Sequence, residues 1–133
     1  MNCAGEDTVL FDTDVLIWHL RGHEGAAERI NRAGERAISV LTRMELLQGT
    51  GNIHHLKAVK NLLRDMDFIV LPLTPNIGSR ALVYVEEYGL VSGIGAGDAI
   101  IAATAVENNL PLISGNFRHF KSIKELSLVS FKP

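Results

Sequence analysis

Acidic side chains that could bind a cation occur at separate places in this 133-residue chain. Asp12 directly follows the apolar run 8–11, and Glu45 and Asp98 each lie at the start of a predicted helix. Carboxylates that meet in a half-buried cleft raise each other's pKa unless a cation offsets their repulsion. The chain has neither cysteines nor histidines paired at the spacing of metal ligands. Oxygen ligands of this kind favour Mg²⁺ or Mn²⁺ over zinc. Asp12, Glu45 and Asp98 are therefore candidate ligands of a divalent cation.

Further polar side chains lie beside these acids in the sequence or follow the same predicted strands. Four could support a site, and three arginines could contact phosphates, although arginine is usually a surface residue. The supporting candidates are Asp14, Thr42, Asn116 and His119, and the arginines are Arg21, Arg43 and Arg118. The adjacent His54 and His55 cannot both point to one face of a helix, which favours a solvated surface for this pair.

Each acid also has a structural interpretation that the sequence leaves open. Asp12 could be the N-cap of the helix that follows it. Thr42 and Glu45 have the spacing of a capping box, in which the glutamate bonds back to the backbone amide of the cap residue. Asp98 could cap its helix or complement the helix dipole from the first turn. No single acid decides between these interpretations and a metal site.

The elements that must position these residues alternate between strand and helix. Apolar periodicity and glycine or proline punctuation predict strands at 8–11, 37–40, 68–71, 112–114 and 128–131. The intervening predicted helices cover 15–20, 24–34, 43–48, 53–66, 77–88 and 98–108, with a helical hairpin at 43–66. Apolar strands without strict alternation indicate a mostly parallel sheet covered on both faces, a three-layer α/β/α fold. In such sheets the ligand site lies beyond the carboxyl ends of the strands.

Composition sets the remaining bounds. The length and a 47% hydrophobic content predict one globular domain, residues 1–133, with a core at about 8–131. No apolar run approaches the roughly 20 residues of a membrane helix, and no secretory signal opens the chain, so a cytoplasmic protein without a membrane partner is expected. A formal net charge of −2 does not by itself suggest nucleic acid. Bound cations could still supply positive charge locally, so the charge leaves that question open.

Three segments in their order resemble PIN domains of the VapC toxin type: LFDTDVLIWHLRG, SVLTRMELLQG and GAGDAIIAATAVENNLPLISGNFRHF. The resemblance runs almost from end to end. It implies a Rossmann-like fold and a Mg²⁺- or Mn²⁺-dependent endoribonuclease, the toxin of a type II toxin–antitoxin pair. It also implies a small cognate antitoxin and a homodimer as partners. Asp12, Glu45 and Asp98 match the three acids that hold metal in that family and serve its catalysis, which favours function over capping.

The resemblance further implies hydrolysis of RNA by metal-activated water, with the arginines named above as possible RNA contacts. Many members carry a fourth acid where this chain has Asn116, so a strict two-metal mechanism is in doubt. Two alternatives remain open. Asp12 and Asp14 also fit the motif of a haloacid-dehalogenase-like phosphatase, with Asp12 as nucleophile, and the chain could be a catalytically silent module that binds an antitoxin. Which RNA is cut cannot be predicted, because surface shape and unpaired bases determine that choice.

Overall fold

A five-stranded sheet is the centre of the computed structural model, which describes residues 6–133. The strands run in the order β3-β2-β1-β4-β5, and every neighbouring pair is parallel. Their bounds are β1 (Glu6–Phe11), β2 (Ala33–Ser39), β3 (Ile69–Leu71), β4 (Leu112–Ser114) and β5 (Leu128–Ser130). The predicted parallel sheet is confirmed.

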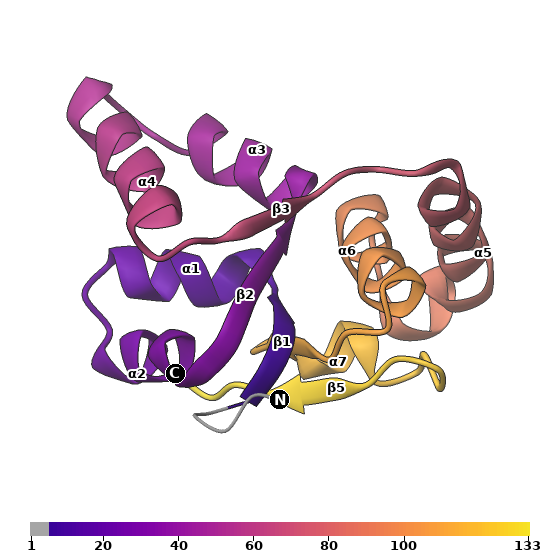
Figure 1. Ribbon diagram of the computed structural model, residues 1–133. Coiled ribbons are helices and arrows are strands. Elements are labelled where there is room, and N and C mark those ends of the chain that lie inside the picture. Colours follow the sequence, from indigo (N-terminus) through magenta and orange to yellow (C-terminus); the bar gives the residue numbers. More distant parts are fainter. Residues whose placement is uncertain (1–5) are drawn as a thin grey trace.

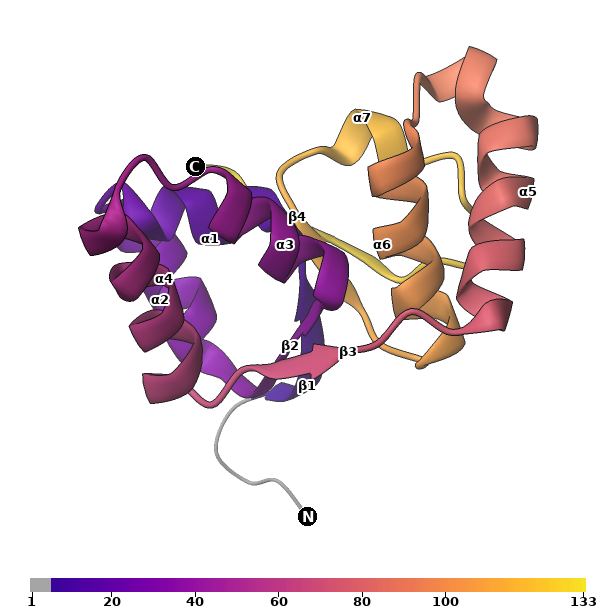
Figure 2. The same cartoon turned by 90° about the horizontal axis from the view of Figure 1, so that it is seen from above.

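Helices cover both faces of this sheet. They are α1 (Thr13–Leu20), α2 (Glu24–Arg32), α3 (Val40–Gln48), α4 (Ile53–Asp65), α5 (Pro75–Ser92), α6 (Ala96–Glu107) and α7 (Phe117–Phe120). Figure 1 shows α1 to α4 on one side of the sheet and α5 to α7 on the other, and the view from above in Figure 2 shows the same separation. The three-layer α/β/α architecture is thus confirmed. Between Glu6 and Pro133, no helix is long and apolar enough to cross a membrane.

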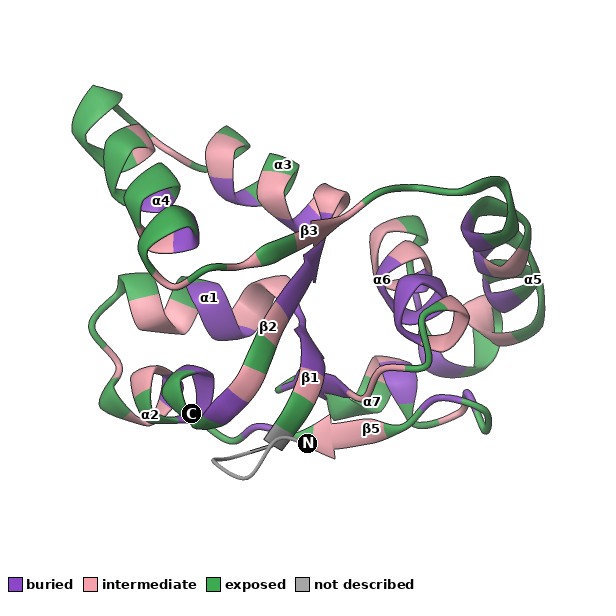
Figure 3. Cartoon of the chain, viewed as in Figure 1, coloured by how far each residue is buried: buried purple, intermediate pink, exposed green. Residues whose placement is uncertain are grey.

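The central strand β1 packs against both helical layers. Val9 and Phe11 belong to the apolar cluster on the side of α1 to α4, whereas Leu10 belongs to the cluster on the side of α5 to α7. Successive side chains of a strand point to opposite faces, so covering both faces requires an apolar run without alternation. Figure 3 shows the C-terminal half of β1 buried, with exposed residues on the outer surfaces of α4 and α5. Burying each such large side chain stabilises the fold by about 1.5–3 kcal/mol.

Helix α6 is the most deeply buried helix of the second layer. Its inward residues are mostly small, and Ala99, Ala102 and Ala103 are fully buried. Small side chains allow the helix backbone to lie close to the sheet and to α5. This packing fixes the first turn of α6, which carries Asp98.

The predicted start of one strand and the predicted start of one helix were wrong. β2 begins at Ala33 instead of residue 37, because its polar first half pairs with β1 in parallel register, as in Thr8 opposite Glu35. After the buried Ala33, residues 34–36 carry no apolar signal, so backbone pairing extends the strand there. Helix α3 begins at Val40, three residues before the predicted start, and is capped by Ser39, whose Oγ accepts from the backbone N–H of Leu41.

Two other predictions also fail along the second layer. Helix α5 was expected to end at Gly89 but continues to Ser92, where Gly93 ends it in the left-handed conformation with φ of 76°. A glycine inside a helix weakens it without stopping it, whereas a left-handed residue terminates it. The sequence predicts no helix at residues 117–120, which form the short helix α7.

Gly78, inside α5, and Gly93, directly after its end, provide a matched test of this helix boundary. Gly93→Ala should destabilise the protein by about 1 kcal/mol, because alanine is strained at positive φ. Gly78→Ala should stabilise it by up to about 1 kcal/mol, because that position is helical and a methyl group there meets open space. Urea denaturation of both variants measures the two effects. Equal effects of the two substitutions would contradict the assigned end of α5.

Candidate metal centre

The candidate site lies where the strand order reverses, between the adjacent strands β1 and β4. From β1 the chain adds β2 and β3 on one side, and β4 and β5 lie on the other. Such a switch point leaves a crevice outside the carboxyl ends of the two central strands. Asp12 lies at this point, because its backbone N–H donates to the carbonyl of Ile113 at 2.9 Å.

Asp12 is almost fully buried, with 4% of its surface exposed. Its Oδ1 accepts from the backbone N–H of Thr13 at 2.8 Å, and its Oδ2 accepts from the Ser114 hydroxyl at 2.7 Å. Burial, with the charges of Asp14 and Asp98, raises the pKa of Asp12 to about 7 despite these hydrogen bonds. The predicted capping role is present, since Asp12 is the N-cap of α1, but the carboxyl group is costly to ionise because it is buried near other acids.

Asp14 lies in the first turn of α1 and faces the same strand ends. Its Oδ2 accepts from the backbone N–H of Gly115 at 2.9 Å, while its Oδ1 is buried without a hydrogen-bond partner. Burial raises the pKa of Asp14, and the charge of Asp98 contributes in the same direction. An unpartnered buried carboxylate oxygen is costly, and a cation would satisfy it.

Glu45 does not form the capping box that its spacing allowed. Helix α3 is already capped at Ser39, so Thr42 lies inside the helix, fully buried. Glu45 instead accepts a hydrogen bond at 2.7 Å from the hydroxyl of Thr13, which also lies 2.9 Å from the Thr42 hydroxyl. Thr13, which follows Asp12 in the chain, thus connects Glu45 to Asp12.

Asp98 is not the N-cap of α6, because that position is Gly95. Its Oδ2 lies 2.9 Å from Nδ1 of His119, and the same nitrogen lies 2.8 Å from Nδ2 of Asn116. A ring nitrogen that donates to the carboxylate cannot also accept from the amide, so the His119 tautomer and the Asn116 amide orientation are coupled. Both predicted supporting residues of the last motif are therefore brought to Asp98.

The predicted acids thus meet at one edge of the sheet, but not as a ready-made cage. Within residues 6–133, no three side chains of His, Cys, Asp or Glu converge as metal ligands in this arrangement. Two observations nevertheless fit a cation: the unpartnered Asp14 oxygen and the raised pKa of Asp12. Oxygen donors without sulfur suit Mg²⁺ or Mn²⁺. The metal-binding roles of Asp12, Glu45 and Asp98 stay predictions.

The three arginines predicted to contact RNA lie in or next to three different helices, and this role stays a prediction. Arg21 follows α1, stacks over Trp18 at 5.9 Å and lines a groove that also contains Glu45. Arg118 is exposed on α7, next to His119. Arg43 points across α3 into a different hollow.

Two site residues were missed from the sequence. Ser114 donates to Asp12, and Thr13 donates to Glu45. Ser114 was recognised only as the end of a strand, and Thr13 only as the residue between two acids. Their positions beside the predicted acids were the signal available, because hydroxyls at strand ends commonly orient neighbouring carboxylates.

The fold and the acids define an α/β protein with an acidic centre at its switch point, and comparison with known proteins identifies its family. The PIN domain family model matches residues 9–126. The chain belongs to the PIN domain family. It is 38% identical over 122 residues to "Ribonuclease VapC10" of Mycobacterium tuberculosis, covering 89% of this chain and 90% of that protein. It is 30% identical over 125 residues to "Ribonuclease VapC1" of Methanocaldococcus jannaschii, covering 92% and 86%.

A solved structure agrees with this assignment. The "Toxin-antitoxin complex from Klebsiella pneumoniae" contains a chain that superposes with a TM-score of 0.79 at 29% identity, covering 92% of this chain and 96% of that one. The predicted resemblance to PIN domains of the VapC type is confirmed.

The raised pKa of Asp12 predicts a pH-dependent gain of stability in Asp12→Asn. The pKa of Asp12 lies near 7 in the folded protein and its ordinary value is 3.8, so ionising Asp12 lowers the unfolding free energy as pH rises through this window. An amide removes that penalty and can still accept from Thr13. In chelator at pH 8 the variant should be more stable, by at most about 4 kcal/mol at 1.36 kcal/mol per pKa unit.

The advantage of this variant should shrink toward pH 4, where the parent binds the proton. Thermal melts at several pH values measure it. The exposed Asp67→Asn, in which only a solvated carboxylate changes, serves as the matched control. A stability difference between Asp12→Asn and the parent that stays constant across the pH range would refute the assigned coupling.

Proposed function

We propose that this chain is an endoribonuclease toxin of the VapC type, which hydrolyses RNA phosphodiester bonds with Mg²⁺ or Mn²⁺ held by Asp12, Glu45 and Asp98. The observation that carries the proposal is the group of Asp12, Asp14 and Asp98, in which burial and the charges of neighbouring acids raise the pKa of Asp12 and of Asp14. Its position at the switch point of a PIN fold, and the ribonuclease names of the relatives, support the same conclusion.

Each residue of the centre has a role that follows from its contacts. A bound divalent cation lowers the pKa of water and offsets the charge of the phosphoryl oxygens. Thr13 orients Glu45 by its hydroxyl, and Ser114 orients Asp12 in the same way. His119 holds Asp98 in place and is itself contacted by Asn116, a neutral side chain at the position where a fourth acid would add charge. This neutral position favours tight binding of one cation over two.

The phosphatase alternative is not favoured. A nucleophilic aspartate must be approached by a tetrahedral phosphate, whereas Asp12 is 4% exposed and both its oxygens accept hydrogen bonds. The chain also belongs to the PIN family. The silent-module alternative makes the opposite prediction for cleavage, so the following experiment separates it from the proposal.

Purified protein, freed of any partner, should cleave RNA in Mg²⁺ or Mn²⁺ and lose that activity in EDTA. Asp98→Asn should lower the rate at least about 100-fold, because one charge leaves the cation site. Helicity should be kept, because Asp98 is not a helix cap, and the melting temperature should not fall, because the substitution removes a charge that repels Asp12 and Asp14. Gel analysis of total RNA with the metal removed and restored measures the effect.

Asp67→Asn is the isosteric control for this experiment, since Asp67 is exposed in a turn beyond α4 and tolerates asparagine at its positive φ. Undiminished cleavage by Asp98→Asn at saturating metal would remove Asp98 from the site. No cleavage by the parent under any metal condition would instead favour the silent module.

A groove beside the acidic centre fits the antitoxin that the resemblance implies. It encloses about 480 Å³ between α1, α3 and α4, and its lining includes Ile17, Leu20, Leu46 and Glu45. Ile17 and Leu20 are partly exposed apolar side chains, suited to the apolar face of a partner helix. The apolar residues of α4 contribute less, because Val59 and Leu63 are largely core residues.

Because Glu45 lines this groove, a chain lying in the groove passes close to the acids. A guanidinium matches carboxylates through its fork of donors, so the partner should insert an arginine where a cation would bind. The structure of the Klebsiella pneumoniae relative is described as a toxin–antitoxin complex, which supports a partner of this kind.

The product of the neighbouring upstream reading frame, co-expressed with this chain, should bind it and inhibit RNA cleavage. Replacing the arginine of that partner's C-terminal tail by alanine should restore cleavage while binding persists, since the groove contacts remain. Leu20→Asp should weaken the complex at least about tenfold, because a charge is buried in an apolar contact. Pull-down and a cleavage assay measure both. Inhibition that survives the arginine replacement would contradict the insertion.

A homodimer is the second proposed assembly. Three apolar side chains of α5 are exposed: Leu82 by 59%, Leu90 by 103% and Val91 by 78%. Exposed apolar patches mark protein–protein contacts, and this one could bind a second copy of the chain. We also expect the protein to act in the cytoplasm, where its RNA substrate is found.

A further inference from the structure

A second hollow lies on the other side of α3 from the acidic centre, and its rim is basic. It encloses about 270 Å³ between α3, α4 and β3. Its lining consists of the cations Arg43, Lys60 and Arg64 and the apolar residues Leu63, Phe68 and Val70. We refer to these six residues as the basic hollow.

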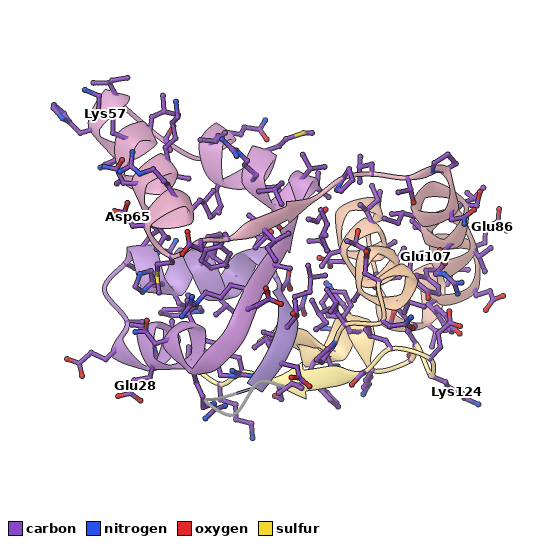
Figure 4. All side chains as sticks on the ribbon, viewed as in Figure 1. Glu28, Lys57, Asp65, Glu86, Glu107 and Lys124 are labelled. Carbon is purple, nitrogen blue, oxygen red and sulfur yellow. The ribbon has the colours of Figure 1, made fainter. Side chains whose placement is uncertain are left out.

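The cations of the basic hollow form part of a longer stripe. Lys57, Lys60 and Arg64 are spaced three and four residues apart on α4, so they share one face of the helix. Figure 4 shows Lys57 at the outer end of α4, and Arg43 faces the stripe from α3. The stripe extends over about 10 Å of helix at 1.5 Å per residue.

Little in the described part of the chain neutralises this stripe. Arg64 contacts Asp65 at 3.1 Å, but both side chains are mostly exposed, at 72% and 64%, so the pair is weak. Arginines elsewhere are engaged differently: Arg36 donates to backbone carbonyls, and Arg80 pairs with acids. In a chain of net charge −2, the basic hollow is therefore a local concentration of positive charge.

The floor of the hollow adds a second property. Leu63 is buried, whereas Phe68 and Val70 are partly exposed, and the Phe68 ring contacts Phe11 edge-on at 6.1 Å. Cations above an apolar and aromatic floor suit a nucleotide, whose phosphate meets the charges while its base or sugar covers the floor. An acidic protein segment would use the cations but leave the floor uncovered.

Helix α3 connects the hollow to the acidic centre. Thr42 and Glu45 face the centre, whereas Arg43 points into the hollow. At 100° per residue, Met44 lies between Arg43 and Glu45 on the helix surface, and it is 52% exposed. A nucleic-acid strand that leaves the acidic centre over Met44 reaches the basic hollow after crossing α3, which is about 10–12 Å wide.

We propose that the basic hollow binds backbone phosphates of the RNA substrate a few nucleotides from the bond that is cut. The proposal rests on the proposed ribonuclease function and adds a place where RNA is held apart from the metal. It explains how an acidic protein with an acidic centre retains a polyanion: the anchoring charges and the cutting site lie on opposite sides of α3.

Binding of labelled single-stranded RNA of about 12 nucleotides, a length within the usual site sizes of single-strand binders, tests the proposal. Affinity is measured by fluorescence anisotropy in Mg²⁺, in full-length protein carrying Asp98→Asn to prevent cleavage. Adding Lys60→Ala and Arg64→Ala should weaken binding about tenfold. The slope of log affinity against log salt should fall by about 1.4, at roughly 0.7 per phosphate contact on a single strand.

Lys124→Ala with Lys132→Ala removes the same charge elsewhere and is the matched control. Figure 4 shows Lys124 at the end of the molecule opposite Lys57. This control should change affinity less than about twofold, because the surface charge is screened beyond about 10 Å. A dinucleotide, too short to cross α3, should show a much smaller loss with the Lys60 and Arg64 substitutions than the longer RNA.

The possible outcomes separate the two proposals. If neither the Asp98→Asn parent in Mg²⁺ nor the unsubstituted chain in Ca²⁺ binds RNA, the ribonuclease function fails and the basic hollow proposal fails with it. If the parent binds RNA but the hollow variant and the lysine control lose affinity equally, only the hollow proposal is overturned. The same holds if the hollow variant loses affinity equally for the dinucleotide and for the longer RNA. It is also overturned if the hollow variant keeps its RNA affinity and loses only affinity for the protein partner.

Discussion

The burial of carboxylates beside one another at the switch point is the constraint on which the rest of this structure depends. Asp12 and Asp14 both lie in or beside the first turn of α1, and Asp98 enters from α6 on the opposite side of the sheet. Each of the first two has a raised pKa because it is buried near other acids. Folding does not by itself require such a group, and its cost in stability fits the cation binding that we propose.

The fold supplies the stability that holds these acids together. The central β1 packs against both helical layers, so Asp12 follows a strand that cannot shift without disturbing two apolar clusters. The small residues of α6 fix the depth of Asp98 in the same way. Ser114 and Thr13 then orient individual carboxylates by hydroxyl donors. The centre is thereby positioned by core packing and adjusted by single hydrogen bonds.

Helix α3 separates two regions of opposite charge. Glu45 on one side belongs to the acidic centre and to the groove proposed for the antitoxin, while Arg43 on the other lines the basic hollow. An inhibitor in the groove and RNA in the hollow would therefore not compete for the same contacts on α4. Competition would arise only at the acids, where an inserted guanidinium and a cation need the same oxygens.

The sequence by itself determined the order of strands and helices, the parallel sheet with two covered faces, and the acids that follow its strands, because apolar periodicity and strand-end position are local properties. It also carried the family resemblance. Only the tertiary structure decided that Glu45 bonds to Thr13 instead of capping α3, and that Ser114 bonds to Asp12 across 102 residues. It likewise decided that Arg43 faces away from the acids. These outcomes depend on helix starts, strand register and the rotation of each helix, which are set by packing between distant segments and leave no local trace in the sequence.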